Sequence, residues 1–104
     1  MRKIEIQMNS AIAKSGNMSQ DNTKVISNDE VSFVYLHGNI IAMIGDTWLR
    51  IFDGDYRSQT TKSRLNAILT AHGNGERIYQ KSGDWFLQNS DGSVIPFMSG
   101  MRLA

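Results

Sequence analysis

The chain has 104 residues, the size of one ordinary domain. Eleven Lys and Arg residues against ten Asp and Glu residues leave a net charge of +1. This balance excludes a strongly basic nucleic-acid coat and an acidic DNA mimic as descriptions of the whole molecule. The sequence contains no cysteine, so a disulfide framework, a thiolate nucleophile and a cysteine-ligated zinc site are also excluded.

The N-terminal segment differs from the rest in composition. Residues 2–8 alternate between apolar and polar side chains, a pattern that predicts a short strand. Residues 9–22 are mainly small and polar, and such a segment buries too little apolar surface to offset its ordering entropy. We therefore predict a loop or mobile arm there, with a short helix over residues 10–15 as the alternative.

This contrast sets the expected domain organisation. We expect an N-terminal strand and mobile arm at residues 1–22, followed by a single α+β domain at residues 23–104. Polar residues interrupt the N-terminal apolar positions, so we expect no export signal and an intracellular protein. No apolar run approaches the ~20 residues that cross a bilayer, so we expect no membrane partner.

Residues 23–52 have the pattern of an antiparallel meander. Two segments rich in β-branched, aromatic and aliphatic side chains, residues 31–36 and 40–44, predict strands. A third segment, residues 47–52, alternates in the same way. The turns between them, such as His37-Gly38-Asn39, are too short for a parallel crossover, so neighbouring strands must be antiparallel. Three or four strands are expected here.

The apolar period then changes from strand to helix. Leu65, Ile68 and Leu69 have the i, i+3, i+4 spacing of one helix face, which predicts an amphipathic helix over about residues 60–72. Gly73 is typical of a helix end. Because so short a helix is marginal in water by itself, we expect this face to pack on the sheet.

The C-terminal third has the pattern of a hairpin and an edge segment. Residues 76–80 and 84–88 predict its two strands, and residues 94–98 predict an edge strand or packed tail because Pro96 lacks a backbone donor. The predicted fold is thus α+β: an antiparallel sheet of five or six strands with one helix packed on one face.

The sequence offers no catalytic constellation. The two histidines, His37 and His72, are far apart in sequence and show no metal-ligand spacing, and no nucleophile elbow is present. Asp53-Gly54-Asp55 is typical of a polar turn. Gly73-Asn74-Gly75 follows the predicted helix, whereas phosphate-binding glycines precede one. We expect no enzyme activity, no cofactor and no metal.

The start of the predicted helix is the leading candidate for a binding site. Five Lys or Arg residues between positions 57 and 81, against Glu76 alone, give a local charge of +4. A helix N-terminus adds free N–H groups and partial positive charge. Tyr79, between Arg77 and Lys81, is the best placed aromatic for stacking on a base. The candidate partner- or anion-binding residues are Arg57, Thr60, Lys62, Ser63, Arg64, Asn66, Arg77, Tyr79 and Lys81. The alternative is that these charges are ordinary solvated ion pairs.

Three segments together resemble a known group. They are residues 34–42 (VYLHGNIIA), 60–69 (TTKSRLNAIL) and 79–87 (YQKSGDWFL). In this order they resemble small proteins of tailed bacteriophages, over about residues 23–88. The resemblance implies a phage accessory protein made in the cytoplasm of the bacterial host. It implies no catalytic residue, because none is established for that group.

Three functional hypotheses follow. The leading one is a stoichiometric binding protein that inhibits a host or defence macromolecule, in the manner of anti-CRISPR or host-takeover inhibitors. The second is a small nucleic-acid-binding module that uses the basic cluster around the helix start. The third, weaker one is a small-anion or nucleotide-binding protein. A host or defence protein is the expected partner, with nucleic acid as the alternative, and a homodimer stays open.

Overall fold

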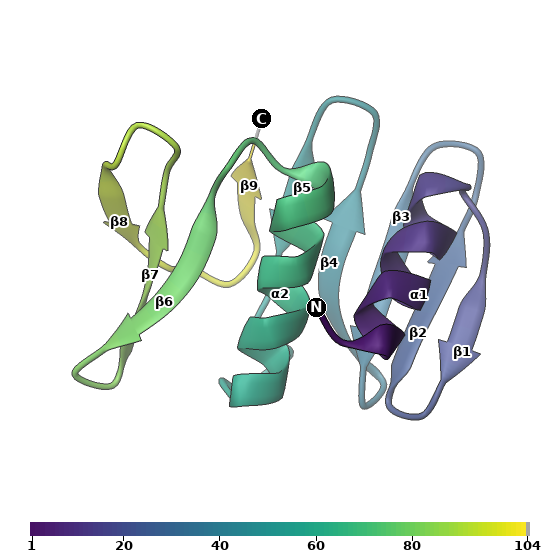
Figure 1. Ribbon diagram of the computed structural model, residues 1–104, viewed down its shortest axis with the longest axis horizontal. Coiled ribbons are helices and arrows are strands. Elements are labelled where there is room, and N and C mark those ends of the chain that lie inside the picture. Colours follow the sequence, from purple (N-terminus) through teal and green to yellow (C-terminus); the bar gives the residue numbers. More distant parts are fainter. Residues whose placement is uncertain (104) are drawn as a thin grey trace.

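The computed structural model describes residues 1–103. Its two helices and nine strands follow the order that Figure 1 shows. They are α1 (Lys3–Ala13), β1 (Met18–Gln20), β2 (Thr23–Ser27), β3 (Ser32–Leu36), β4 (Asn39–Ile44), β5 (Leu49–Ile51), α2 (Gln59–His72), β6 (Arg77–Lys81), β7 (Asp84–Gln88), β8 (Val94–Pro96) and β9 (Met101–Leu103).

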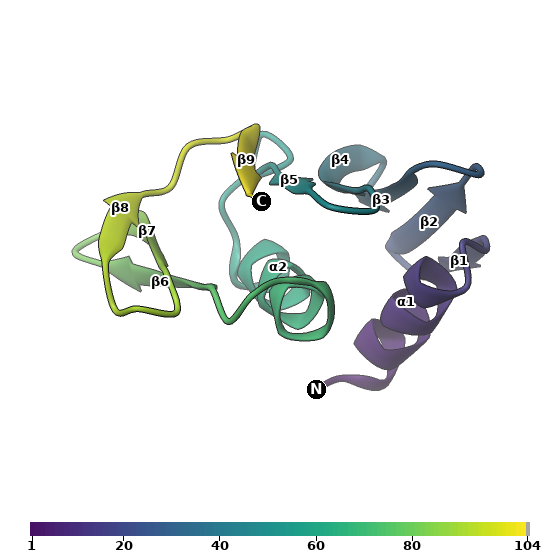
Figure 2. The same cartoon turned by 90° about the horizontal axis from the view of Figure 1, so that it is seen from above.

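The larger sheet is a six-stranded antiparallel layer in the order β1-β2-β3-β4-β5-β9. Short turns join β1 to β5, as the meander pattern predicts. His37 and Gly38 both have positive φ, the conformation that lets two residues reverse the chain between β3 and β4. Both helices lie on the same side of this sheet, and Figure 2 shows its other side uncovered by any described element.

A bulge in the middle of the sheet improves its fit to the helices. The register between β3 and β4 shifts at Val34/Tyr35, so that Val34 pairs with Ala42 and Tyr35 pairs with Ile40. The extra residue, Ile41, therefore faces the helices together with Ala42, and both are fully buried. Two consecutive β4 side chains thus enter the core in place of one.

The predicted helix is confirmed as α2. Ser58 caps it, since its side chain accepts a hydrogen bond from the Thr61 N–H at 3.1 Å. Leu65, Ile68 and Leu69 are all fully buried against the sheet. The α+β class and the antiparallel sheet are confirmed as well.

The prediction for the N-terminal segment is wrong. Residues 3–13 form α1, whose Met8, Ala11 and Ile12 lie in the same core as the residues of α2. Ile6, which the strand pattern places beside Met8, is 57% exposed. An arm separate from residues 23–104 is not seen, because α1 packs on β2 and α2, and β1 extends the large sheet. The fold has two helices rather than one.

The C-terminal hairpin forms a sheet of its own. Strands β6, β7 and β8 pair in that order and do not join the large sheet. The Asn66 side chain of α2 bonds backbone groups of β6 that could otherwise pair with another strand. It donates a hydrogen bond to the Ile78 C=O and accepts one from the Ile78 N–H. The predicted edge strand near Pro96 is confirmed as β8, and β9 was absent from the prediction.

Candidate functional site

Arg64, a member of the basic cluster predicted at the helix start, is buried in the fold. Its guanidinium donates to Glu5 Oε2 at 2.9 Å, to Thr23 Oγ1 at 3.0 Å and to Asn22 Oδ1 at 3.2 Å. Side chains of Arg64 and Glu5 are each 3% exposed. The expectation that Arg64 points outward is wrong, because α1 brings a carboxylate beneath it that the sequence pattern assigned to a strand.

Two other predicted site residues also hold the fold together. Ser63 Oγ donates to Glu5 Oε2 at 2.6 Å, on the same carboxylate oxygen that Arg64 contacts. Asn66 fastens α2 to β6 through Ile78, as described above. Both side chains are half-buried. A role for either in partner binding stays a prediction.

The groups around Glu5 favour its ionised carboxylate. Burial acts to raise the pKa of Glu5, but hydrogen bonds from Ser63, the Arg2 backbone and Arg64, with the positive charge of Arg64, outweigh it and lower that pKa. The ionised carboxylate therefore stabilises the fold. Its contribution is complete above the ordinary glutamate pKa of about 4.3 and is lost as pH falls through the lower, folded-state value.

We predict a corresponding acid step in stability. The melting temperature of the wild-type protein will fall as pH drops below about 4, and Glu5→Gln will lack the part of this fall that Glu5 causes. His72 gives a separate step at higher pH. Because burial lowers the pKa of His72, the fold favours its neutral form, and stability begins to fall as pH drops below about 6.5. Thermal melts between about pH 7 and pH 3 measure both. Parallel curves for wild type and Glu5→Gln would contradict this account.

The other two cations of the helix start, Arg57 and Lys62, also have partners. Arg57 pairs with Asp53 at 3.2 Å, and its guanidinium carbon lies over the rings of Trp85 and Phe97. Lys62 is half-buried and donates to Gln80 Oε1 at 3.3 Å. The expected anion site thus has Arg64 buried and Arg57 already paired, which leaves Lys62 as its cation.

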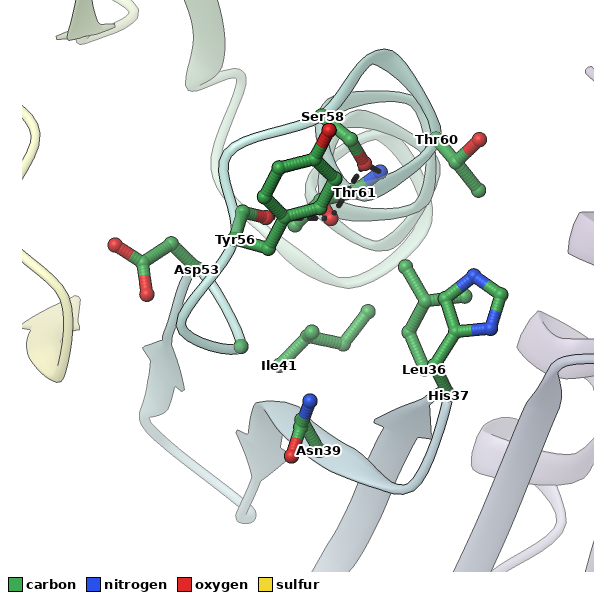
Figure 3. Close-up of a pocket in the computed structure, with 10 residues that line it drawn as sticks. Leu36, His37, Asn39, Ile41, Asp53, Tyr56, Ser58, Thr60 and Thr61 are labelled. Carbon is green, nitrogen blue, oxygen red and sulfur yellow. Dashed lines mark hydrogen bonds between the residues drawn. The ribbon is translucent and has the colours of Figure 1, made fainter.

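A hollow of about 270 Å³ lies between the N-terminal end of α2 and the turn after β3. In Figure 3, Leu36 and Ile41 supply its apolar side, with His37 and Thr60 at the edge. Ser58 and Thr61 bond each other, and within residues 1–103 no hydrogen bond joins His37 to Asp53.

The described part of the chain shows no metal site. No group of three or more His, Asp or Glu side chains in residues 1–103 is arranged to hold a metal ion. No helix in the same range has the length and apolar character needed to cross a membrane.

The uncovered side of the large sheet is a surface that the sequence reasoning missed. We call it the open sheet face and define it by the outward side chains of β2 to β5 and β9. One row across the strands pairs Ile26 with Phe33, Phe33 with Met43, Met43 with Arg50 and Arg50 with Arg102. A second row contains Lys24, Tyr35 and Ile40. The members are Lys24, Ile26, Phe33, Tyr35, Ile40, Met43, Arg50 and Arg102.

The open sheet face combines partly exposed apolar groups with positive charge. Ile26 is 41% exposed, and Phe33, Tyr35, Ile40 and Met43 are each partly exposed. Trp48, just before β5, extends the surface, since the Arg102 guanidinium carbon lies 5.4 Å from its ring centre. Within the described residues, none of the six strands contains Asp or Glu. Its strand positions are therefore cationic as well as apolar, and Asp55 lines a hollow with Tyr35 and Ile40 at one end of the face.

The signal for this face was present in the sequence but ambiguous. Outward and inward side chains alternate along β2, β3 and β5, and both sets contain large apolar groups. Which set faces the core depends on the side that the helices occupy, and α1 was not predicted. The strand pattern alone therefore could not separate a core face from a contact face.

The other predicted residues gather on the small sheet. Arg77, Tyr79 and Lys81 alternate along β6 on the side opposite the buried Ile78. Phe86 of β7 pairs with Tyr79 in register, and the two ring centres are 5.6 Å apart. The structure thus places these three predicted residues together, separate from Arg64 and Ser63.

Comparison with known proteins identifies the family. A family model described as "Kyanoviridae Gp96 protein" matches residues 1–104. Neither a curated protein nor a solved structure matches the chain at a significant level. The expected resemblance to a phage protein is confirmed at the level of a phage family.

Proposed function

We propose, from the premise that the chain belongs to the Kyanoviridae Gp96 family of phage proteins, that it acts by binding a host or defence protein. It is a phage accessory protein that works in the cytoplasm of the infected bacterium as a stoichiometric inhibitor, without catalysis. The open sheet face is the observation that supports this proposal.

The composition of the open sheet face suits a protein partner. Aromatic residues, Met and Arg are the types enriched at the centres of protein interfaces, and buried aromatic and Arg side chains supply most of their binding energy. Phe33, Met43 and Arg50 stand in register at the middle of the face.

Charge favours an acidic partner over a second copy of the chain. A face-to-face dimer brings two sets of Lys24, Arg50 and Arg102 onto one surface, and like charges across an interface weaken it. A partner that presents carboxylates around an apolar centre meets the same three cations favourably. Arg suits this contact because its guanidinium binds a carboxylate with two parallel hydrogen bonds.

We predict that reversing two charges on the open sheet face weakens partner binding. Wild-type protein immobilised at low salt will retain a host protein from nuclease-treated lysate, and that protein, once purified, will bind in a 1:1 ratio. The Arg50→Glu/Arg102→Glu variant will bind it at least about tenfold more weakly. Both side chains are exposed, so circular dichroism will show an unchanged fold.

The matched control reverses two exposed cations, one at each end of α1. Lys3→Glu/Lys14→Glu makes the same change in net charge away from the open sheet face and will bind as the wild type does. Equal retention by both double variants contradicts the proposal, and so does a lysate from which nothing is retained. Light scattering that finds a dimer of the wild-type chain, converted to a monomer by Phe33→Ser, assigns the face to self-association instead.

A further inference from the structure

The outer side of the small sheet presents a second surface, independent of the open sheet face. Along β6 the side chains alternate, so Ile78 is buried while Arg77, Tyr79 and Lys81 face outward. Phe86 faces outward from β7, whose Trp85 and Leu87 are buried on the inner side. In Figure 2 the small sheet lies beside α2, at the end of the molecule opposite α1.

Two aromatic rings form the centre of this surface. The rings of Tyr79 and Phe86 are 5.6 Å apart with an angle of 27° between their planes, and both are partly exposed. Pro96 of β8 stands next to Phe86 in register and is exposed, so the platform continues across all three strands. The two rings stack on each other at the surface, and planar groups can extend such a stack.

Positive charge surrounds the two rings. The Arg77 guanidinium carbon is 5.7 Å from the Tyr79 ring centre, and Lys81 follows two residues later on the same side of β6. Lys62 of α2 does not add to this surface, because its partner Gln80 lies on the Ile78 side of β6. Asp84, opposite Lys81, is the one carboxylate at a strand position of this side. Cations thus exceed acids around the rings, and the surface suits an anionic ligand with planar groups.

We propose that this surface binds single-stranded nucleic acid, with bases stacked on Tyr79 and Phe86 and phosphates against Arg77 and Lys81. Stacking of this kind requires unpaired bases, because the bases of a duplex are covered by their neighbours. Stacking on Tyr79 and Phe86 therefore favours a single strand over a duplex.

Fluorescence anisotropy with a labelled oligothymidylate of about 12 nucleotides tests the proposal. Wild-type protein will bind at about 50 mM salt and will bind more weakly as salt rises. Tyr79→Ala and Phe86→Ala will each weaken binding by about fivefold or more, whereas Tyr79→Phe will keep the ring and the affinity. A duplex of the same length will bind more weakly than the single strand.

The charge variants supply an independent readout. Arg77→Gln and Lys81→Gln will each reduce the slope of log affinity against log salt by about 0.7, the value for one phosphate contact on a single strand. Lys14→Gln removes an exposed cation at the end of α1 and will leave the slope unchanged. Circular dichroism on each variant separates loss of binding from loss of fold.

Several results overturn the proposal. These are no binding at about 50 mM salt, binding that salt does not weaken, equal affinity for wild type and Tyr79→Ala, and a preference for duplex. Loss of oligonucleotide binding in Arg50→Glu/Arg102→Glu but not in Arg77→Gln places the nucleic acid on the open sheet face instead. Because the assay uses purified protein and oligonucleotide, its failure leaves the capture of a host protein untouched.

Discussion

Replacing Arg64 with methionine will destabilise the protein by about 3–5 kcal/mol, a large share of the free energy of unfolding of a domain this size. The substitution keeps the length and packing of the side chain but leaves the Glu5 carboxylate buried with no cation beside it. Thr23 and Asn22 lose a hydrogen-bond donor at the same time. Urea unfolding, followed by circular dichroism, gives the free energy directly.

Two further variants show that the ion pair causes this loss. Lys62→Met, two residues away on the same helix, removes a cation bonded only to Gln80 among the described residues and will cost no more than about 0.5 kcal/mol. The double variant Glu5→Gln/Arg64→Met removes both charges and will be less destabilised than the sum of the two single variants. If Arg64→Met and Lys62→Met prove equally mild, Arg64 is not in the core.

Trp85→Ala will lower the free energy of unfolding by about 3–5 kcal/mol, because it leaves a cavity on the inner side of the small sheet. Trp85 is 2% exposed, meets Phe97 edge to face at 5.4 Å and lies beneath the Arg57 guanidinium. Its loss removes the ring contact with Phe97 on the segment that leads to β9, whereas the hydrogen bond from the Phe97 N–H to the Trp85 C=O remains. Urea unfolding followed by circular dichroism measures the change, since the substitution also removes a fluorophore.

The neighbouring residue provides the control for Trp85. Phe86 is also aromatic but faces outward on the same strand, so Phe86→Ala will cost about 1–2 kcal/mol. Equal costs for the two substitutions would mean that the strand does not separate a buried side from an exposed one. That result would also remove the basis for a stacking surface at Tyr79 and Phe86.

Local patterns predicted the elements whose contacts are local. The face formed by Leu65, Ile68 and Leu69 identified α2, and short turns identified the antiparallel neighbours of the meander and the hairpin. In α1 the same method failed because Ile4, Ile6 and Met8 fit a strand as well as a helix. The partner that decides the matter, Arg64, is 59 residues from Glu5 in sequence.

The candidate site was predictable only in part for the same reason. A sequence shows that Arg64 and Arg77 are cations but not which of them a buried carboxylate neutralises. Arg77 and Tyr79 were predicted on one strand, because alternation along a strand is a local property, and the structure extends that strand to Lys81. The open sheet face depends on which side the helices cover, which is a property of the whole fold.

The ion pair between Glu5 and Arg64 also affects when α1 can fold into place during synthesis at the ribosome. The first helix of the nascent chain carries a carboxylate that has no counterion until residue 64 has been translated and has left the exit tunnel. Docking α1 earlier would desolvate a lone negative charge, which is strongly unfavourable. Helix α1 therefore reaches its final place only after residue 64 has emerged.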